Sequence, residues 1–91
     1  MIEIKFELEN KKAVAYDEGK EIGKLTFSVN GNVWSIEHTF VDKNYGGQGI
    51  AKKLVKITVD EAKKRDIKII PVCSYVKKEF EKNDEYKEVE Y

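Results

Sequence analysis

The chain has 91 residues, of which 17 are basic and 17 acidic, so its formal net charge at pH 7 is zero. This length favours one domain spanning residues 1–91, and it argues against a large active-site cavity with its own lid domain. Zero net charge argues against binding nucleic acid through bulk charge, and the single cysteine, Cys73, excludes an internal disulfide. The N-terminal residues lack the continuous apolar run of a signal peptide or a membrane span. We therefore expect a globular cytoplasmic protein, monomeric or weakly dimeric, without a membrane or nucleic-acid partner.

Four segments among the first 42 residues have the pattern of β-strands. In the first of them, apolar and charged side chains alternate with a strict period of two, which is typical of a half-buried strand. The first turn is expected at Asn10-Lys11, and the other two contain glycine, in Asp17-Glu18-Gly19-Lys20 and in Asn30-Gly31. The predicted strands are 2–8, 13–16, 22–29 and 33–41. Their close spacing predicts an antiparallel meander.

The hydrophobic period changes after this meander. From Gly47 to about Arg65, apolar residues recur at a spacing close to 3.6, which predicts a long amphipathic helix. Residues 67–72 form a short apolar run that predicts a buried fifth strand, in which Pro71 marks a bulge or the end of pairing. A second helix is expected over 74–83, followed by a tail that is a candidate last strand.

The order of elements is therefore β-β-β-β-α-β-α. A strand–helix–strand unit at 33–72 should pair the fourth and fifth strands in parallel through a right-handed crossover. We expect an α+β fold with a mixed, mostly antiparallel sheet and helices packed against it.

The segment between the fourth strand and the long helix is the most informative for function. It contains three glycines, Gly46, Gly47 and Gly49, which leave the backbone N–H groups of the first helical turn uncovered. These groups lie at the positive end of the helix dipole, where phosphate or pyrophosphate binds, and Lys52 and Lys53 add positive charge. In the alternative interpretation, the glycines only form a loop and the lysines only solvate a helix.

The distribution of charge agrees with an anionic ligand at this place. Residues 43–68 carry eight basic and three acidic side chains, whereas residues 1–42 carry five and eight, and residues 69–91 carry four and six. The zero net charge is therefore a cancellation, and the positive part is concentrated in the loop and the long helix.

Three strings of residues resemble the GNAT superfamily of acetyl-CoA-dependent N-acetyltransferases. Gly46-Gly47-Gln48-Gly49-Ile50-Ala51 is similar to motif A, Arg/Gln-x-x-Gly-x-Gly/Ala, although Gly46 stands at the Arg/Gln position and lacks that side-chain contact to the pyrophosphate. Small stand-alone members share a His-Thr before the loop, here His38-Thr39, and a string like Pro71-Val72-Cys73-Ser74-Tyr75 after the fifth strand. The resemblance implies a minimal GNAT-like fold in which the fourth and fifth strands splay apart.

The resemblance also implies a site for acetyl-CoA, or coenzyme A, as co-substrate. The pantetheine arm would bond the backbone near Phe40 and Val41, and the thioester would point toward residues 73–75. The implied activity is direct attack by a primary amine, of a small molecule or a protein, on the thioester. The pyrophosphate would lie on Gly46, Gly47, Gln48, Gly49, Ile50 and Ala51, beside Lys52. No Cys/His spacing suits zinc, so we expect no metal.

Cys73 and Tyr75 are the first candidates for catalysis. Cys73 is either a small buried apolar residue or a group that faces the acetyl, as leaving-group acid or transient acyl acceptor. Tyr75 is either the acid or a packing residue.

His38 is a third candidate. It shares a strand face with Trp34, Ile36 and Phe40, which favours a core histidine over a general base, and Glu37 on the other face is a weaker candidate base. Two other functions remain open: a non-catalytic module that binds CoA or senses acyl groups, and a small interaction domain whose edge strands recruit a partner.

Overall fold

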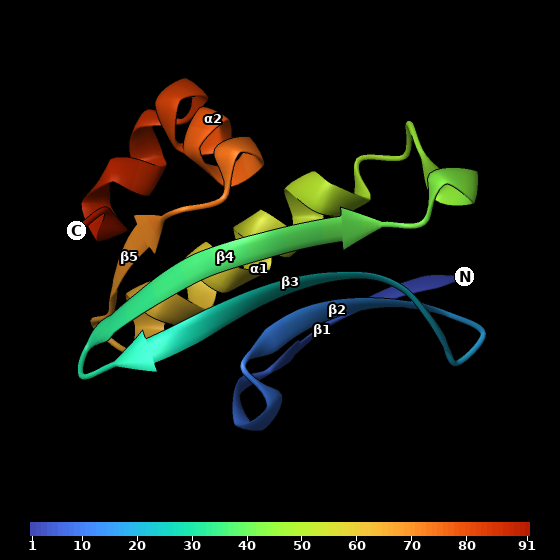
Figure 1. Cartoon of the computed structure of the whole chain (residues 1–91), viewed down its shortest axis with the longest axis horizontal. Coiled ribbons are helices and arrows are strands. Elements are labelled where there is room, and N and C mark those ends of the chain that lie inside the picture. Colours follow the sequence, from blue (N-terminus) through green and yellow to red (C-terminus); the bar gives the residue numbers. More distant parts are fainter.

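The computed structural model describes residues 1–91, and its strands and helices follow the predicted order (Figure 1). The strands are β1 (Ile2–Glu7), β2 (Lys12–Asp17), β3 (Lys20–Asn30), β4 (Val33–Val41) and β5 (Lys68–Pro71). The α-helices are α1 (Ile50–Lys64) and α2 (Ser74–Lys82), and short 3₁₀ helices lie at Leu8–Asn10, Lys43–Tyr45 and Asp84–Val89. Neither α-helix combines the length and the apolar character that crossing a membrane requires.

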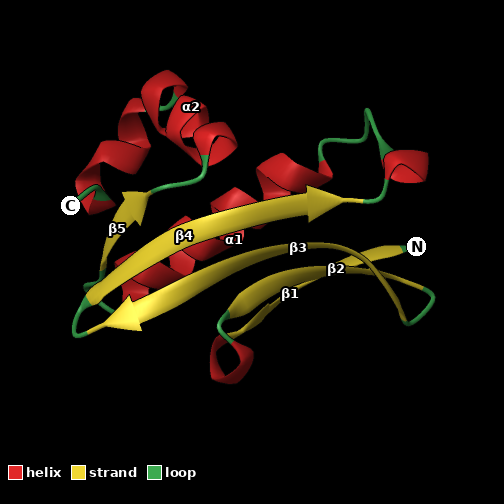
Figure 2. Cartoon of the chain, in the orientation of Figure 1, coloured by secondary structure: helices red, strands yellow, loops and turns green.

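All five strands form one sheet in the order β1-β2-β3-β4-β5, and α1 lies behind it (Figure 2). The first four strands pair antiparallel with their neighbours, whereas β4 and β5 pair in parallel. Parallel neighbours need a long crossover, and the 15 residues of α1 supply it. The predicted α+β fold, with its fourth and fifth strands parallel, is confirmed.

The two tight turns of the meander form at glycines with positive φ. Gly19 has φ 81° and turns the chain from β2 to β3, as predicted. Between β3 and β4, Asn30 pairs with Val33, so the central residues of the turn are Gly31, with φ 63°, and Asn32. This turn lies one residue later than expected, because Asn30 still belongs to the strand.

The core lies between the sheet and α1. The side of α1 that faces the sheet is buried at intervals of three and four residues, as its hydrophobic period predicts. From the sheet, Phe27 stacks against Trp34 with ring centroids 4.7 Å apart, and Phe6 stacks against both rings. The buried α1 residues are Ile50, Leu54, Val55, Thr58, Val59 and Ala62.

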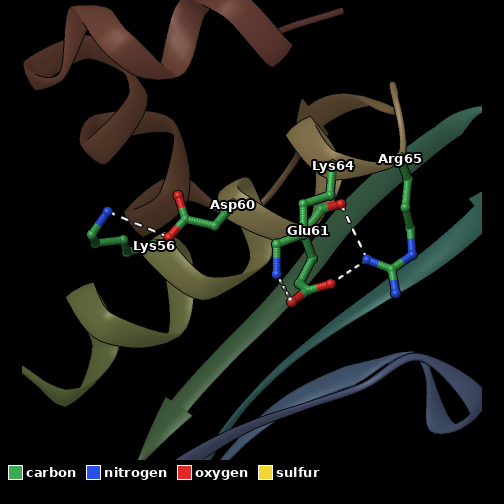
Figure 3. A network of polar contacts seen from close by, with 5 residues as sticks. All are labelled: Lys56, Asp60, Glu61, Lys64 and Arg65. Carbon is green, nitrogen blue, oxygen red and sulfur yellow. Dashed lines mark hydrogen bonds and ion pairs between the residues drawn. The ribbon is translucent and has the colours of Figure 1, made fainter.

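Ion pairs flank the buried side of α1 (Figure 3). Glu61 pairs with Arg65 and lies 3.4 Å from the Lys64 ammonium, and Lys56 lies 3.4 Å from Asp60. The hydrogen bond from Arg65 lowers the pKa of Glu61, against the opposing effect of burial. The Lys56–Asp60 pair has both side chains exposed and contributes little to stability, whereas the buried side chains of α1 pack against the sheet and hold the helix in place.

A β-bulge interrupts β4 halfway along its length. The register with β3 pairs Ile36 with Phe27 but His38 with Thr26, which leaves Glu37 as an extra residue. Because side chains alternate along a strand, one extra residue exchanges the two faces beyond it.

The bulge overturns the prediction that His38 is a core histidine. Trp34 is buried against α1, but beyond the bulge it is Thr39 and Val41 that continue this face. His38 is exposed on the other face of the sheet, where the Phe40 side chain is 59% exposed.

The C-terminal tail does not form a last strand. It folds as the 3₁₀ helix Asp84–Val89, whose Tyr86 and Val89 are buried three residues apart. A single parallel bridge then joins Glu90 to Ile69 of β5, and the Tyr91 N–H donates to the Ile69 carbonyl at 2.9 Å. The apolar spacing of three across this segment favours a tight helix over an extended strand.

Candidate functional site

The fourth and fifth strands separate where β5 ends. The ladder between them stops at Ile36 and Pro71, and the N–H groups of Val72 and Cys73 both donate to the Ile36 carbonyl, at 3.1 and 3.0 Å. Residues 37–41 of β4 therefore have no partner strand on the side of β5. The segment that follows β5 turns away from β4 and enters α2 (Figure 1). The predicted splaying of the two strands is confirmed, and it leaves backbone groups of β4 open beside α2.

The glycine loop presents an uninterrupted run of free backbone donors. The N–H groups of residues 47–52 donate to no acceptor within the protein. Gly47 and Gly49 have φ of 80° and 72°, and a Cβ added at either would have no heavy atom within 4 Å. Gly49 is the N-cap of α1, so no capping side chain covers the first turn of the helix. Such a run at a helix N-terminus is suited to an anionic group.

Two side chains hold this loop against the rest of the protein. The Asp42 carboxylate accepts from the Asn44 N–H at 2.9 Å, which starts the short 3₁₀ helix before the glycines. The Tyr45 hydroxyl donates to Asp17 at the end of β2, over 2.6 Å. This hydrogen bond, followed by the one from the N-terminal ammonium, lowers the pKa of Asp17.

A pocket of about 260 Å³ opens beside the loop. Of the predicted coenzyme-binding residues, all except Gln48 and Phe40 line it. Of the three predicted catalytic residues, Tyr75 lines it, whereas Cys73 and His38 do not. The bulge explains Phe40 and His38, because it turns both side chains to the far face of the sheet. The residues that line the pocket are Val41, Tyr45, Gly46, Gly47, Gly49, Ile50, Ala51, Lys52 and Tyr75.

Tyr75 reaches this pocket from the first turn of α2. Burial raises the pKa of its hydroxyl to about 12, and the nearby Glu79 carboxylate adds to the effect. The side chain therefore stays protonated at neutral pH, and its hydroxyl is a weaker acid than that of an ordinary tyrosine.

Cys73 lies at the N-cap of α2 and is half-buried. Its sulfur is 3.7 Å from the Thr39 hydroxyl, which the bulge has turned toward it. Burial raises the pKa of the thiol, but the Val76 N–H, the Thr39 hydroxyl and the Tyr75 N–H together outweigh it, so the pKa is lowered. The thiolate is thus favoured more than in an ordinary cysteine.

The sequence does not predict the roles of two residues near the site. Thr39 belongs to the His38-Thr39 string, but its approach to Cys73 depends on the bulge. Tyr45 carried no signal beyond its place before the glycines, since its partner Asp17 is 28 residues away in the chain. No group of three or more His, Cys, Asp or Glu side chains is placed to hold a metal ion.

Comparison with known proteins identifies the family. A family model for GCN5-related N-acetyl-transferase matches residues 5–89. None of the curated proteins matches the sequence.

Solved structures give the same picture. An NMR structure of a GCN5-like protein from Staphylococcus aureus is 37% identical, with a TM-score of 0.77, over 98% of this chain and 87% of the other. The GNAT family N-acetyltransferase YhbS from Escherichia coli, solved with CoA, is 34% identical with a TM-score of 0.51, over 56% of this chain and 32% of the other.

The fold alone is shared with a more distant enzyme. The ribosomal-protein-S18-alanine N-acetyltransferase from Escherichia coli is 22% identical, with a TM-score of 0.60, over 64% of this chain. This chain spans 38% of that enzyme and 32% of YhbS, so both have extensive regions that find no match here. Since the family model covers nearly the whole sequence, the chain belongs to the GCN5-related N-acetyltransferase (GNAT) family.

Proposed function

We propose that the protein binds acetyl-CoA and transfers the acetyl group to a primary amine. The observation that carries the proposal is the run of unpartnered N–H groups at residues 47–52, on the wall of the 260 Å³ pocket. The CoA complex of the structurally similar YhbS supports it. The pyrophosphate lies on the loop beside Lys52, and the pantetheine arm follows β4 beyond the bulge, where the backbone lacks a partner strand.

The reaction is direct attack of the amine on the thioester. The neutral amine nitrogen attacks the carbonyl carbon, a C–N bond forms, the C–S bond breaks, and the nitrogen loses a proton to solvent. Tyr75, which lines the pocket and is protonated at neutral pH, donates a proton to the leaving thiolate and regains one from solvent. Holding the two reactants together supplies much of the remaining rate enhancement. The acceptor is an amine of a small molecule or of a protein.

A specific observation favours a second candidate function. No carboxylate or imidazole lines the pocket, so no side chain there can act as a general base. The position of the motif's Arg or Gln is also taken by Gly46. A module that binds CoA without turnover would need neither group.

Cys73 offers a second chemical route. Its lowered pKa suits an acyl acceptor, in which the sulfur would take the acetyl group from CoA before the amine does. Because the side chain does not line the pocket, direct transfer is the simpler route.

Calorimetry with acetyl-CoA tests the binding step. Wild type should bind, and Gly49→Glu should not, because it places a negative charge among the phosphate-binding N–H groups. Gly31→Glu is the matched control, since Gly31 also has a positive φ, 63°, and open space around its Cβ. A wild-type protein that gives no binding heat would refute both the transferase and the CoA module, and would leave the interaction domain.

A panel of primary amines, with release of free CoA thiol as the readout, tests turnover. Tyr75→Phe should lower kcat by about 100-fold or more while KM for acetyl-CoA changes little. Tyr91→Phe, at a side chain that is 77% exposed, is the control and should leave the rate unchanged. Binding without acetylation of any amine would support the non-catalytic module instead.

A further inference from the structure

A second pocket adjoins the glycine loop. It has a volume of about 240 Å³ and lies between α1 and α2. Four lysines line it: Lys52, Lys53 and Lys56 from the first turns of α1, and Lys82 from the last turn of α2. Lys52 also lines the glycine-loop pocket, so the two pockets share a wall. We call the second pocket the lysine groove.

The lysine groove has an excess of positive charge that the protein does not neutralise. Lys52, Lys53 and Lys82 take part in none of the ion pairs, while Lys56 is paired with Asp60 at 3.4 Å (Figure 3). Like charges so close together repel one another, and they favour an anion between them.

Glu79, the only acidic residue of the groove, does not remove this excess. Its side chain is buried, with 4% exposed, and it forms an ion pair with none of the lysines. The carboxylate accepts instead from the Asn83 amide, at 3.4 Å. Lys53 and Lys82 therefore line the groove from two different helices, and neither forms an ion pair with a carboxylate.

We propose that the lysine groove binds the 3′-phosphate of CoA, so that the protein prefers CoA to dephospho-CoA. This proposal rests on the proposed function. The ribose 3′-phosphate of CoA is a phosphate monoester, which carries about two negative charges at neutral pH. It lies on the adenosine side of the pyrophosphate, away from the thioester. With the pyrophosphate on the loop and the thioester near Tyr75, the adenosine end leaves past Lys52 into the groove.

Calorimetry with two ligands tests this proposal. CoA and dephospho-CoA share the pyrophosphate and the pantetheine arm and differ only in the 3′-phosphate. Wild type should bind CoA about tenfold more tightly, as two or three partly exposed ion pairs would produce. Lys82→Gln should reduce this preference, and Lys53→Gln with Lys82→Gln should nearly abolish it. Binding of dephospho-CoA should change much less than that of CoA in both variants.

Lys78→Gln is the matched control. Lys78 is exposed on the same helix as Lys82, forms no ion pair and lines neither pocket, so its removal should leave the preference for CoA as in wild type. The preference should also weaken between 50 and 200 mM salt in wild type, because screening acts on exposed charges.

The outcomes separate this proposal from the proposed function. Equal affinity of wild type for the two ligands would overturn the role of the groove but would uphold CoA binding at the loop. A double variant that keeps the full preference would also overturn it, since the 3′-phosphate would then be recognised elsewhere. If neither ligand binds, the proposed function fails, and this proposal fails with it.

Discussion

Adding one methyl group at Gly47 separates the conformational role of the glycine loop from its role in binding. Gly47 and Gly19 have almost the same φ, 80° and 81°, and neither has a heavy atom within 4 Å of an added Cβ. Gly47 lines the pocket, whereas Gly19 lies in the turn between β2 and β3. Gly47→Ala and Gly19→Ala therefore impose the same backbone strain, and only the first changes the proposed site.

The cost to stability should be equal in the two variants. A residue with a Cβ in the left-handed region costs about 1–2 kcal/mol, and no steric clash adds to this at either position. For a chain of this size, each kcal/mol lowers Tm by about 4–8 °C. Both variants should remain folded at room temperature, because a typical domain has about 5–15 kcal/mol of stability.

The effect on binding should differ. At Gly47 the methyl group would occupy the surface across which the phosphate oxygens of the proposed complex would reach the free N–H groups. We therefore expect the affinity for CoA to fall about tenfold or more, equivalent to about 1.4 kcal/mol. Thermal unfolding with and without CoA measures both effects, because a ligand that binds the folded state raises Tm. Gly19→Ala should keep the wild-type shift. An equal shift in Gly47→Ala would refute the assignment of the loop as the phosphate site.

Three further predictions concern the surroundings of the site and the core. Tyr45→Phe removes a hydrogen bond that lowers the pKa of Asp17, so urea unfolding should show a loss of stability at pH 7. A lowered carboxyl pKa contributes its full stability to the folded state only at pH values above the pKa of the same carboxyl in the unfolded chain. The loss of stability in the variant should therefore shrink as the pH falls from about 4 through the lowered pKa of Asp17. A loss that stays constant over this range would contradict the account. Thr39→Val removes the hydroxyl near Cys73, so the pH midpoint of thiol alkylation should move upward, and an unchanged midpoint would show that the hydroxyl does not act on the thiol. Leu54→Ala leaves a cavity at a side chain that is 0% exposed and should cost about 2–5 kcal/mol in urea unfolding; a cost below 1 kcal/mol would show that the site can collapse.

Most of the fold was predictable because its signals are local. The alternation of apolar residues in β1 and the spacing of 3.6 in α1 each arise within one element. The turn at Gly19 depends on the positive φ that this glycine adopts, which is also a local property. The start of α1 was less exact: the helix begins at Ile50, since Gly49 in the left-handed region precedes it. The free N–H groups of the loop were also predictable, because they follow from the glycines at the start of the helix.

The parts that could not be predicted depend on pairing between distant residues. The bulge at Glu37 is defined only by the register between β3 and β4, and the sequence of β4 alone shows an unbroken alternation. It decides that Thr39, and not His38, faces Cys73. In the tail, the spacing of three is carried only by Tyr86 and Val89, which is too short a pattern to exclude a last strand, and the structure alone shows the 3₁₀ helix and its bridge to β5.

The distribution of charge along the chain shows the same division. By itself the sequence determined that positive charge gathers in residues 43–68, that a glycine loop precedes the long helix, and which elements form, because each of these is a property of neighbouring residues. Only the tertiary structure decided which charges share a pocket. Lys82 joins Lys53 because α2 packs beside α1, a contact across 29 positions of chain that no local pattern encodes.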